Sequence, residues 1–159
     1  MSFAKRLQKE IMSDIIIRKA TVEDVSAIAE IEKASIPQPW SEAAFADALA
    51  QENAVTLVAE ADGEIAGFIT GVFLFDNADI YSVATAEQYR KKGIGARLLT
   101  AFFDMLPTEV ETVGLEVRES NSAAISLYER NGFERVGLRR NFYEQPRENA
   151  VLYTKQLRK

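Results

Sequence analysis

Two short stretches of the chain carry residue types that can do chemistry. The first runs from Arg90 to Gly95, where three basic residues precede Gly93 and Gly95. It lies between a predicted strand and a predicted helix, a place where successive backbone N–H groups cradle anions. Glycine lets a backbone approach a ligand closely. The stretch therefore predicts a site for a phosphate-bearing ligand, and the alternative is a solvated basic turn before a helix.

The second stretch begins at Leu115. Strand alternation places Leu115 and Val117 on one face and Glu116 and Arg118 on the other. If helices cover both faces of the sheet, Glu116 is partly desolvated, which makes a carboxylate a better base near neutral pH. The alternative is a glutamate on a wet face, paired with Arg118. Tyr128, on the helix that follows, is a candidate proton donor or simply a core residue.

The hydrophobic pattern predicts the scaffold that positions these stretches. Helices are expected after Thr21, after Ser41, over 93–106 and over 122–131. Turn signals at 61–64 and 76–79 favour an antiparallel meander in the middle of the chain. Strands are expected at 14–19, 55–60, 65–75, 80–85, 112–117, 133–140 and 150–157. The order predicts an α/β protein of the α+β type, with a mixed sheet flanked by helices.

A length of 159 residues is typical of one domain. Residues 1–12 are predicted to be an N-terminal extension, because apolar residues recur there with helical spacing. An upstream start codon is the alternative, since Met12 is itself a plausible beginning. Residues 13–159 are expected to form the single domain.

Composition excludes several classes of site. The chain has no cysteine and no histidine, so thiol nucleophiles, Ser-His-Asp triads and His or Cys metal sites are ruled out, and no metal is expected. Neither a Walker loop nor a complete dinucleotide fingerprint is present. With 19 basic and 24 acidic residues, the chain is expected to bind no nucleic acid directly. Without a long apolar run or a signal sequence, we expect a cytoplasmic protein that does not enter membranes.

The two stretches, in this order and separation, resemble the GNAT acetyltransferase superfamily. Its acetyl-CoA signature, Q/R-x-x-G-x-G/A, is matched by Arg90, Gly93 and Gly95. The longer pattern L-E-V-R-x-S-N-x-x-A-x-x-L-Y-x-x-x-G-F is matched from Leu115 to Phe133, and it resembles the RimI-type branch. The resemblance covers roughly residues 15–153. It implies the GNAT fold, with a mostly antiparallel twisted sheet of about seven strands and about four helices.

The resemblance also implies an activity. RimI-type enzymes acetylate the N-terminal alanine of a small-subunit ribosomal protein with acetyl-CoA, and the amine attacks the thioester directly. By this resemblance Glu116 is the base and Tyr128 the acid that protonates the departing thiolate. The residues expected to bind the cofactor are Val83, Ala84, Thr85, Arg90, Lys91, Lys92, Gly93, Ile94, Gly95, Ala96, Asn121 and Tyr128.

The acceptor site is expected to be lined by Trp40, Phe45, Arg139, Asn141 and Tyr143. For Trp40, packing of the helix pair over the sheet is the alternative. This region departs from the family pattern, since Asn149 stands where aspartate is usual and Phe142 where tyrosine is common. Two other readings therefore stay open: a GNAT enzyme acting on a small amine or a lysine side chain, and a non-catalytic acyl-CoA-binding module.

Overall fold

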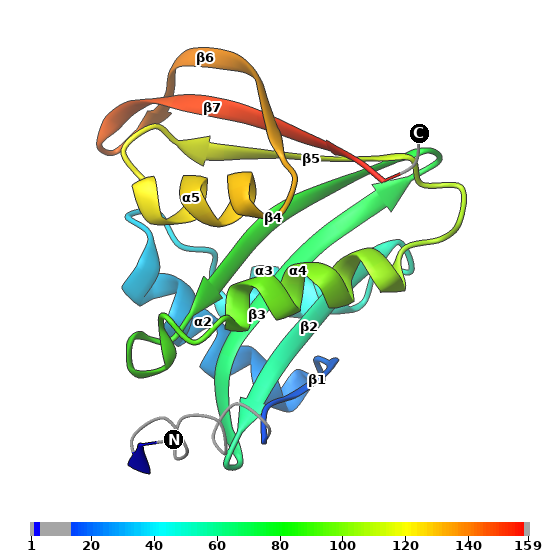
Figure 1. Ribbon diagram of the computed structural model, residues 1–159, viewed down its shortest axis with the longest axis vertical. Coiled ribbons are helices and arrows are strands. Elements are labelled where there is room, and N and C mark those ends of the chain that lie inside the picture. Colours follow the sequence, from blue (N-terminus) through cyan, green and yellow to red (C-terminus); the bar gives the residue numbers. More distant parts are fainter. Residues whose placement is uncertain (1, 4–13, 158–159) are drawn as a thin grey trace.

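The computed structural model describes residues 2–3 and 14–157, which form one twisted sheet with helices on both faces (Figure 1). The strands are β1 (Ile16–Lys19), β2 (Ala54–Ala61), β3 (Glu64–Leu74), β4 (Asn77–Thr85), β5 (Thr112–Arg118), β6 (Glu134–Glu144) and β7 (Arg147–Gln156). The helices are α2 (Val25–Ser35), α3 (Glu42–Leu49), α4 (Ile94–Met105) and α5 (Ser122–Arg130), with short 3-10 turns η1 (Val22–Asp24) and η2 (Glu87–Tyr89). The predicted extension at residues 1–12 lies almost wholly outside the described residues. No helix in the described part of the chain is long and apolar enough to cross a membrane.

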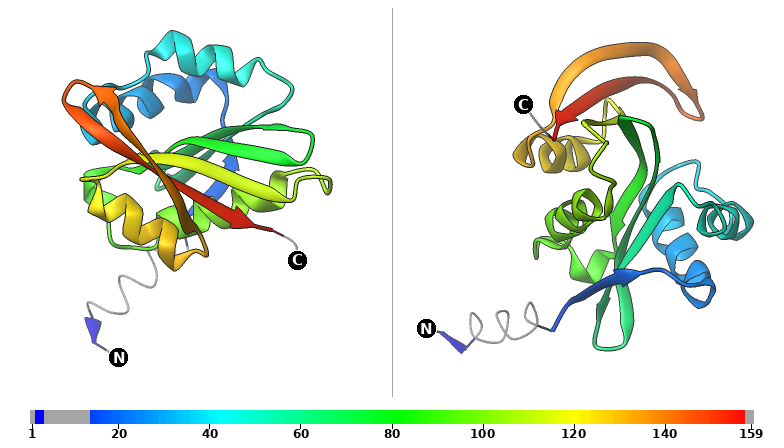
Figure 2. Two further views of the ribbon diagram at one scale, coloured as in Figure 1. Left: turned by 90° about the horizontal axis from the view of Figure 1, so that it is seen from above. Right: turned by 90° about the vertical axis from the view of Figure 1, so that its right-hand side faces the viewer.

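The strand order is β1-β2-β3-β4-β5-β7-β6, and every neighbouring pair is antiparallel except β4 and β5. Helices α2 and α3 cover one face, and α4 and α5 cover the other (Figure 2). The apolar stripe of α4 is buried as its spacing predicts, although Met105 at its end is 40% exposed. The predicted mixed, mostly antiparallel sheet flanked by helices is confirmed.

The parallel pair separates partway along its length. Residues 77–80 of β4 pair with residues 112–115 of β5. Beyond Ile80, β4 pairs with β3 alone, while β5 continues beside β7. Figure 1 shows the two strands diverging like the arms of a V. This split is the feature of the fold that makes room for a ligand between neighbouring strands.

Two boundaries differ from the prediction. The turn expected at 76–79 lies at Phe75 and Asp76, because Asn77 and the residues after it pair with strands on both sides. The last two strands were expected to end at 140 and to begin at 150. They instead form a long hairpin that turns at Gln145 and Pro146. Pairing between β6 and β7 therefore extends the strands into polar residues, at 141–144 and 147–149, whose sequence does not predict a strand.

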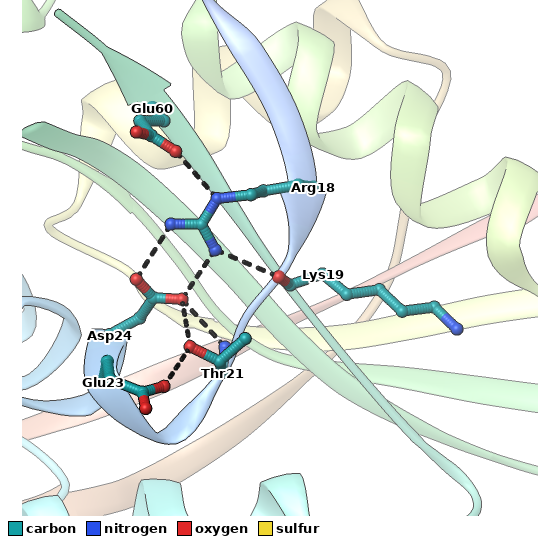
Figure 3. Close-up of polar contacts among 6 residues, drawn as sticks. All are labelled: Arg18, Lys19, Thr21, Glu23, Asp24 and Glu60. Carbon is teal, nitrogen blue, oxygen red and sulfur yellow. Dashed lines mark hydrogen bonds and ion pairs between the residues drawn. The ribbon is translucent and has the colours of Figure 1, made fainter. Parts of the chain in front are cut away.

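A cluster of charged side chains ties the first edge of the sheet to the start of α2 (Figure 3). Arg18 on β1 donates to Glu60 on β2 at 2.8 Å and to both carboxylate oxygens of Asp24 at 2.7 and 3.0 Å. Asp24 also accepts the backbone N–H of Thr21, as the predicted capping box requires. The hydrogen bonds from Arg18 hold the pKa of Asp24 below its ordinary value.

Candidate functional site

A groove of about 860 Å³ lies beside the open end of β4, the loop that precedes α4, and α5. Ten of the twelve residues predicted to bind the cofactor line it, namely Val83, Ala84, Thr85, Arg90, Lys91, Gly93, Ile94, Gly95, Ala96 and Asn121. The other two, Lys92 and Tyr128, do not. The lining thus comes from the open end of β4, from the first of the two predicted stretches and, at Asn121, from the second.

The loop before α4 has the backbone geometry of an anion cradle. Lys91 and Gly93 adopt left-handed conformations, with φ of +64° and +80°, and turns of this kind bring successive N–H groups to one side. Arg90 closes the loop by donating from its Nε to the carbonyl of Thr85 at 3.1 Å. Gly95 has a packing role beside its predicted place in the groove, because a Cβ there would lie 3.0 Å from Leu127. It allows α4 to pack closely against α5.

Basic side chains line this groove in a chain whose net charge is −5. Arg90 and Lys91 come from the loop, and Arg130 comes from α5. The N-terminus of α4 adds the positive end of its helix dipole. Together they favour an anionic ligand such as a phosphate ester.

The other side of the groove is the edge of β4 beyond Ile80, where β4 no longer pairs with β5. Residues 83–85 pair with residues 67–69 of β3 along one edge. Their second edge borders the groove instead of another strand. A β-bulge at Tyr81, between Ile80 and Ser82, lies where the separation begins. Backbone groups on this edge are available to a ligand with amide-like hydrogen-bonding groups.

The predicted catalytic residues lie on β5 and α5. The Glu116 side chain is 32% exposed, and one of its oxygens lies 3.5 Å from Nε of Arg139 on β6. The alternative in which Glu116 pairs with Arg118 is not what the structure shows, because Arg118 pairs with Glu148 at 3.3 Å. The hairpin of β6 and β7 decides these partners, and its path is not visible in the local sequence.

Tyr143 lies near both predicted catalytic residues. Burial raises its pKa, and the nearby charges of Glu116 and Glu148 raise it further, while Arg118 opposes them. Tyr128 is only 6% exposed. Burial raises its pKa too, and the neighbouring Tyr143 adds to the effect. Both phenols therefore stay protonated at neutral pH, and Tyr143 lies within electrostatic range of both Glu116 and Tyr128.

The remaining acceptor candidates have mixed outcomes. Phe45 is 1% exposed and packs against Trp40 and Phe68 in the core. Its predicted place in the acceptor lining is wrong, because the apolar face of α3 is buried against the sheet. Trp40 is half-buried, with its ring against Phe45 and Tyr81. Its backbone N–H donates to the buried carboxylate of Glu32 at 2.7 Å.

On β6, Arg139 and Asn141 are exposed. The Arg139 guanidinium stacks on Phe142, with 5.6 Å between its central carbon and the ring centroid. Asn141 has a φ of +52°, and its N–H donates to the side chain of Asn149 at 2.9 Å. Asn149 thus fills a structural role at the position where the family usually has aspartate.

Sequence reasoning missed part of the groove. Residues 123, 124, 127, 130 and 131 also line it, and their spacing is that of one face of a helix. Helical periodicity read onward from Asn121 would have found them. Ser35 and Ile36 line the groove as well. They end a helix on the opposite face of the sheet, so no local signal marks them.

Residues 25–133 match the Acetyltransferase (GNAT) family. The chain is 36% identical over 144 residues to the [ribosomal protein bS18]-alanine N-acetyltransferase of Salmonella typhimurium, which covers 89% of this chain and 95% of the relative. It is also 36% identical over 141 residues to the N-alpha-acetyltransferase of Sulfurisphaera tokodaii, covering 80% and 84% of the two chains.

The solved structures agree with these relatives. The ribosomal-protein-S18-alanine N-acetyltransferase of Escherichia coli superposes with a TM-score of 0.82 at 32% identity, over 91% of this chain and 95% of the other. The fold predicted from the two sequence stretches is therefore confirmed. The chain belongs to the acetyltransferase (GNAT) family.

Proposed function

We propose that the protein transfers the acetyl group of acetyl-CoA to the N-terminal α-amine of a protein. The observation that carries the proposal is the arrangement around the split sheet. An anion cradle and a free strand edge line one groove, and a carboxylate on β5 and a buried phenol on α5 each lie within electrostatic range of Tyr143.

The donor side binds through the backbone. In this proposal the N–H groups of residues 91–96 hold the pyrophosphate of CoA, and residues 83–85 pair with the pantetheine arm. One N–H of that strand edge polarises the thioester carbonyl, as an oxyanion hole does. The side-chain oxygen of Asn121 caps α5 by accepting from Ala124 at 3.2 Å. Its amide nitrogen is the group through which Asn121 contacts the cofactor.

The chemistry needs one base and one acid. A peptide α-amine has a pKa near ~7.7–8.0, so a modest base is sufficient. Glu116 takes a proton from the amine, directly or through a water, and the nitrogen attacks the thioester carbon. The tetrahedral intermediate releases its second nitrogen proton to solvent, collapses to an amide and expels the CoA thiolate, which Tyr128 protonates. Burial keeps Tyr128 protonated until that step. The Tyr128 phenolate regains a proton from solvent, and Glu116 releases the proton that it took from the amine.

The acceptor that we propose is the N-terminal alanine of a small-subunit ribosomal protein in the cytoplasm. Relatives covering 89% and 81% of the chain carry the name ribosomal protein bS18-alanine N-acetyltransferase. The aromatic side chains of Trp40 and Tyr143 and the guanidinium of Arg139 are the groups proposed to bind the peptide. A small amine or a lysine side chain is the alternative acceptor, and an acyl-CoA-binding module without turnover is the alternative function.

Mass spectrometry tests the proposal after incubation with acetyl-CoA and a panel of acceptors. The panel holds peptides that start with Ala, Ser, Met or Gly, blocked peptides with an internal lysine, and spermidine. We expect one acetyl group on the α-amine of Ala-starting peptides. Acetylation of only spermidine or lysine would overturn the acceptor but keep the reaction. CoA binding without turnover on the whole panel would favour the binding module.

A further inference from the structure

A single buried arginine joins two segments that are far apart in the sequence. The segments are the α2–α3 loop (residues 36–41) and the β6–β7 turn (residues 144–147). Arg118, the last residue of β5, is 9% exposed. One guanidinium nitrogen donates to the carbonyl of Pro146 at 3.0 Å and the other to the side chain of Gln38 at 3.3 Å.

Further contacts fix the guanidinium in place. It donates to the carbonyl of Gln145 at 3.4 Å and to Glu148 at 3.3 Å. Glu148 also accepts the backbone N–H of Ser120, and hydrogen bonds from Ser120 hold the pKa of this carboxyl below its ordinary value. The buried positive charge of Arg118 therefore has an ionised partner, as a buried charge requires.

Arg118 also lies against Tyr143. The central carbon of its guanidinium lies 4.2 Å from the centroid of the Tyr143 ring, and Tyr143 is close enough to Glu116 to be affected by its charge. The planar guanidinium of Arg118 thus faces the Tyr143 ring, while its two terminal nitrogens donate to Gln38 and to the β6–β7 turn. Lysine offers a single ammonium on a flexible stem and cannot reproduce this geometry.

We propose that Arg118 is a positioning residue that sets the acceptor site by pinning both of its walls. In this account it joins Gln38, which lies 80 positions earlier, to a turn 27–28 positions later. Its action is confined to the acceptor, because Arg118 is not part of the groove lined by β4, α4 and α5. This inference rests on the proposed function, which identifies these segments as acceptor walls.

The test compares Arg118→Lys with wild type and with Arg135→Gln, which loses one charge from an exposed position on the same hairpin, outside the two segments. Steady-state kinetics give KM for an Ala-starting peptide and for acetyl-CoA. We expect Arg118→Lys to raise the peptide KM by about tenfold, the effect of losing one or two hydrogen bonds, and to change the acetyl-CoA KM by less than about twofold. Arg135→Gln should match wild type in both.

Hydrogen exchange supplies a readout that does not depend on turnover. Exchange in residues 36–41 and 144–147 is expected to rise together in Arg118→Lys. Gln38→Ala removes one arm alone, so only residues 36–41 should exchange faster. This second variant keeps the test decisive if Arg118→Lys does not fold.

Three results would overturn the inference: an unchanged peptide KM with unchanged exchange, an equal rise in both KM values, or faster exchange across the whole sheet. The last two would indicate a general structural role for Arg118. If wild type acetylates no peptide, the proposed function fails, and the exchange data alone decide whether Arg118 pins the two segments.

Discussion

The two sides of the site are built in different ways. The proposed donor side consists of residues 83–85 and 90–96 and the first turns of α5, and in this proposal it binds its ligand mainly through backbone groups. The proposed acceptor side brings together the α2–α3 loop, the end of β5 and the β6–β7 hairpin. Side chains hold these distant segments, above all Arg118 and the buried Glu32.

This difference has a consequence for mutation. A surface that binds its ligand through backbone groups tolerates most side-chain substitutions, but it loses affinity when a residue can no longer adopt a required positive φ. A side-chain-built surface fails when one buried polar group loses its partners. The two sides should therefore be separable by single substitutions, each of which affects one substrate.

The largest effect is expected at Glu116, where the two sides meet. Glu116→Gln removes the proposed base and should lower kcat by about 10²–10⁴, the usual contribution of one acid–base group. Acetyl-CoA binding, measured by calorimetry, should not change, because Glu116 does not line the groove. Glu134→Gln, at an exposed position of β6, is the matched control. A kcat within about threefold of wild type would remove Glu116 from the mechanism.

Gly93→Ala should weaken the donor side alone. Gly93 has a φ of +80°, and a left-handed conformation costs an L-residue about 1–2 kcal/mol. If the loop shifts to relieve this strain, the Kd for acetyl-CoA rises by about tenfold, while the peptide KM is unchanged. Gly63→Ala is the control, since Gly63 has a similar φ of +78° in an exposed hairpin turn. Equal loss of affinity in both variants would show that the effect is not local.

Arg18→Met tests whether the charged cluster around Arg18 affects stability alone, in contrast to the cluster around Arg118, which is proposed to affect peptide binding. Arg18 pairs with Asp24 and Glu60 away from the groove (Figure 3). Its loss leaves the largely buried Asp24 without its ion pair, so the free energy of unfolding should fall by about 2 kcal/mol. Both KM values should stay at wild-type level, unlike those of Arg118→Lys. Urea unfolding and steady-state kinetics check the two parts, and a raised peptide KM would contradict the assignment.

The smallest effect is a pH dependence at Glu32. Burial raises the pKa of this carboxyl above its ordinary value of 4.5. The unfolded chain therefore loses the proton first, and the stabilising contribution of the protonated form disappears as pH rises through the folded pKa. Glu32→Gln cannot titrate and keeps an oxygen for the N–H of Trp40. Its stability relative to wild type should rise as the pH increases above the ordinary carboxyl pKa of 4.5, and a constant difference would contradict this.

The same contrast explains what could be predicted from the sequence. Six of the ten predicted lining residues lie in one stretch between a strand and a helix, where a local pattern marks them, and the other four, Val83, Ala84, Thr85 and Asn121, were implied by the family resemblance. The acceptor side depends on which strands meet. Phe45 was therefore wrongly placed in the acceptor lining, and the partner of Arg118 was not predicted, because both follow from tertiary packing that no local pattern encodes. The longer hairpin of β6 and β7 was missed for the same reason.

The central claim is that donor and acceptor are bound by separately built surfaces. The most direct measurement is a double-mutant cycle of Gly93→Ala and Arg118→Lys, with KM determined for both substrates. The account predicts that the double variant combines the two single effects, with a coupling below about 0.5 kcal/mol. A coupling above about 1 kcal/mol, or a peptide KM raised by Gly93→Ala alone, would show that the two sides act as one unit and would contradict the account.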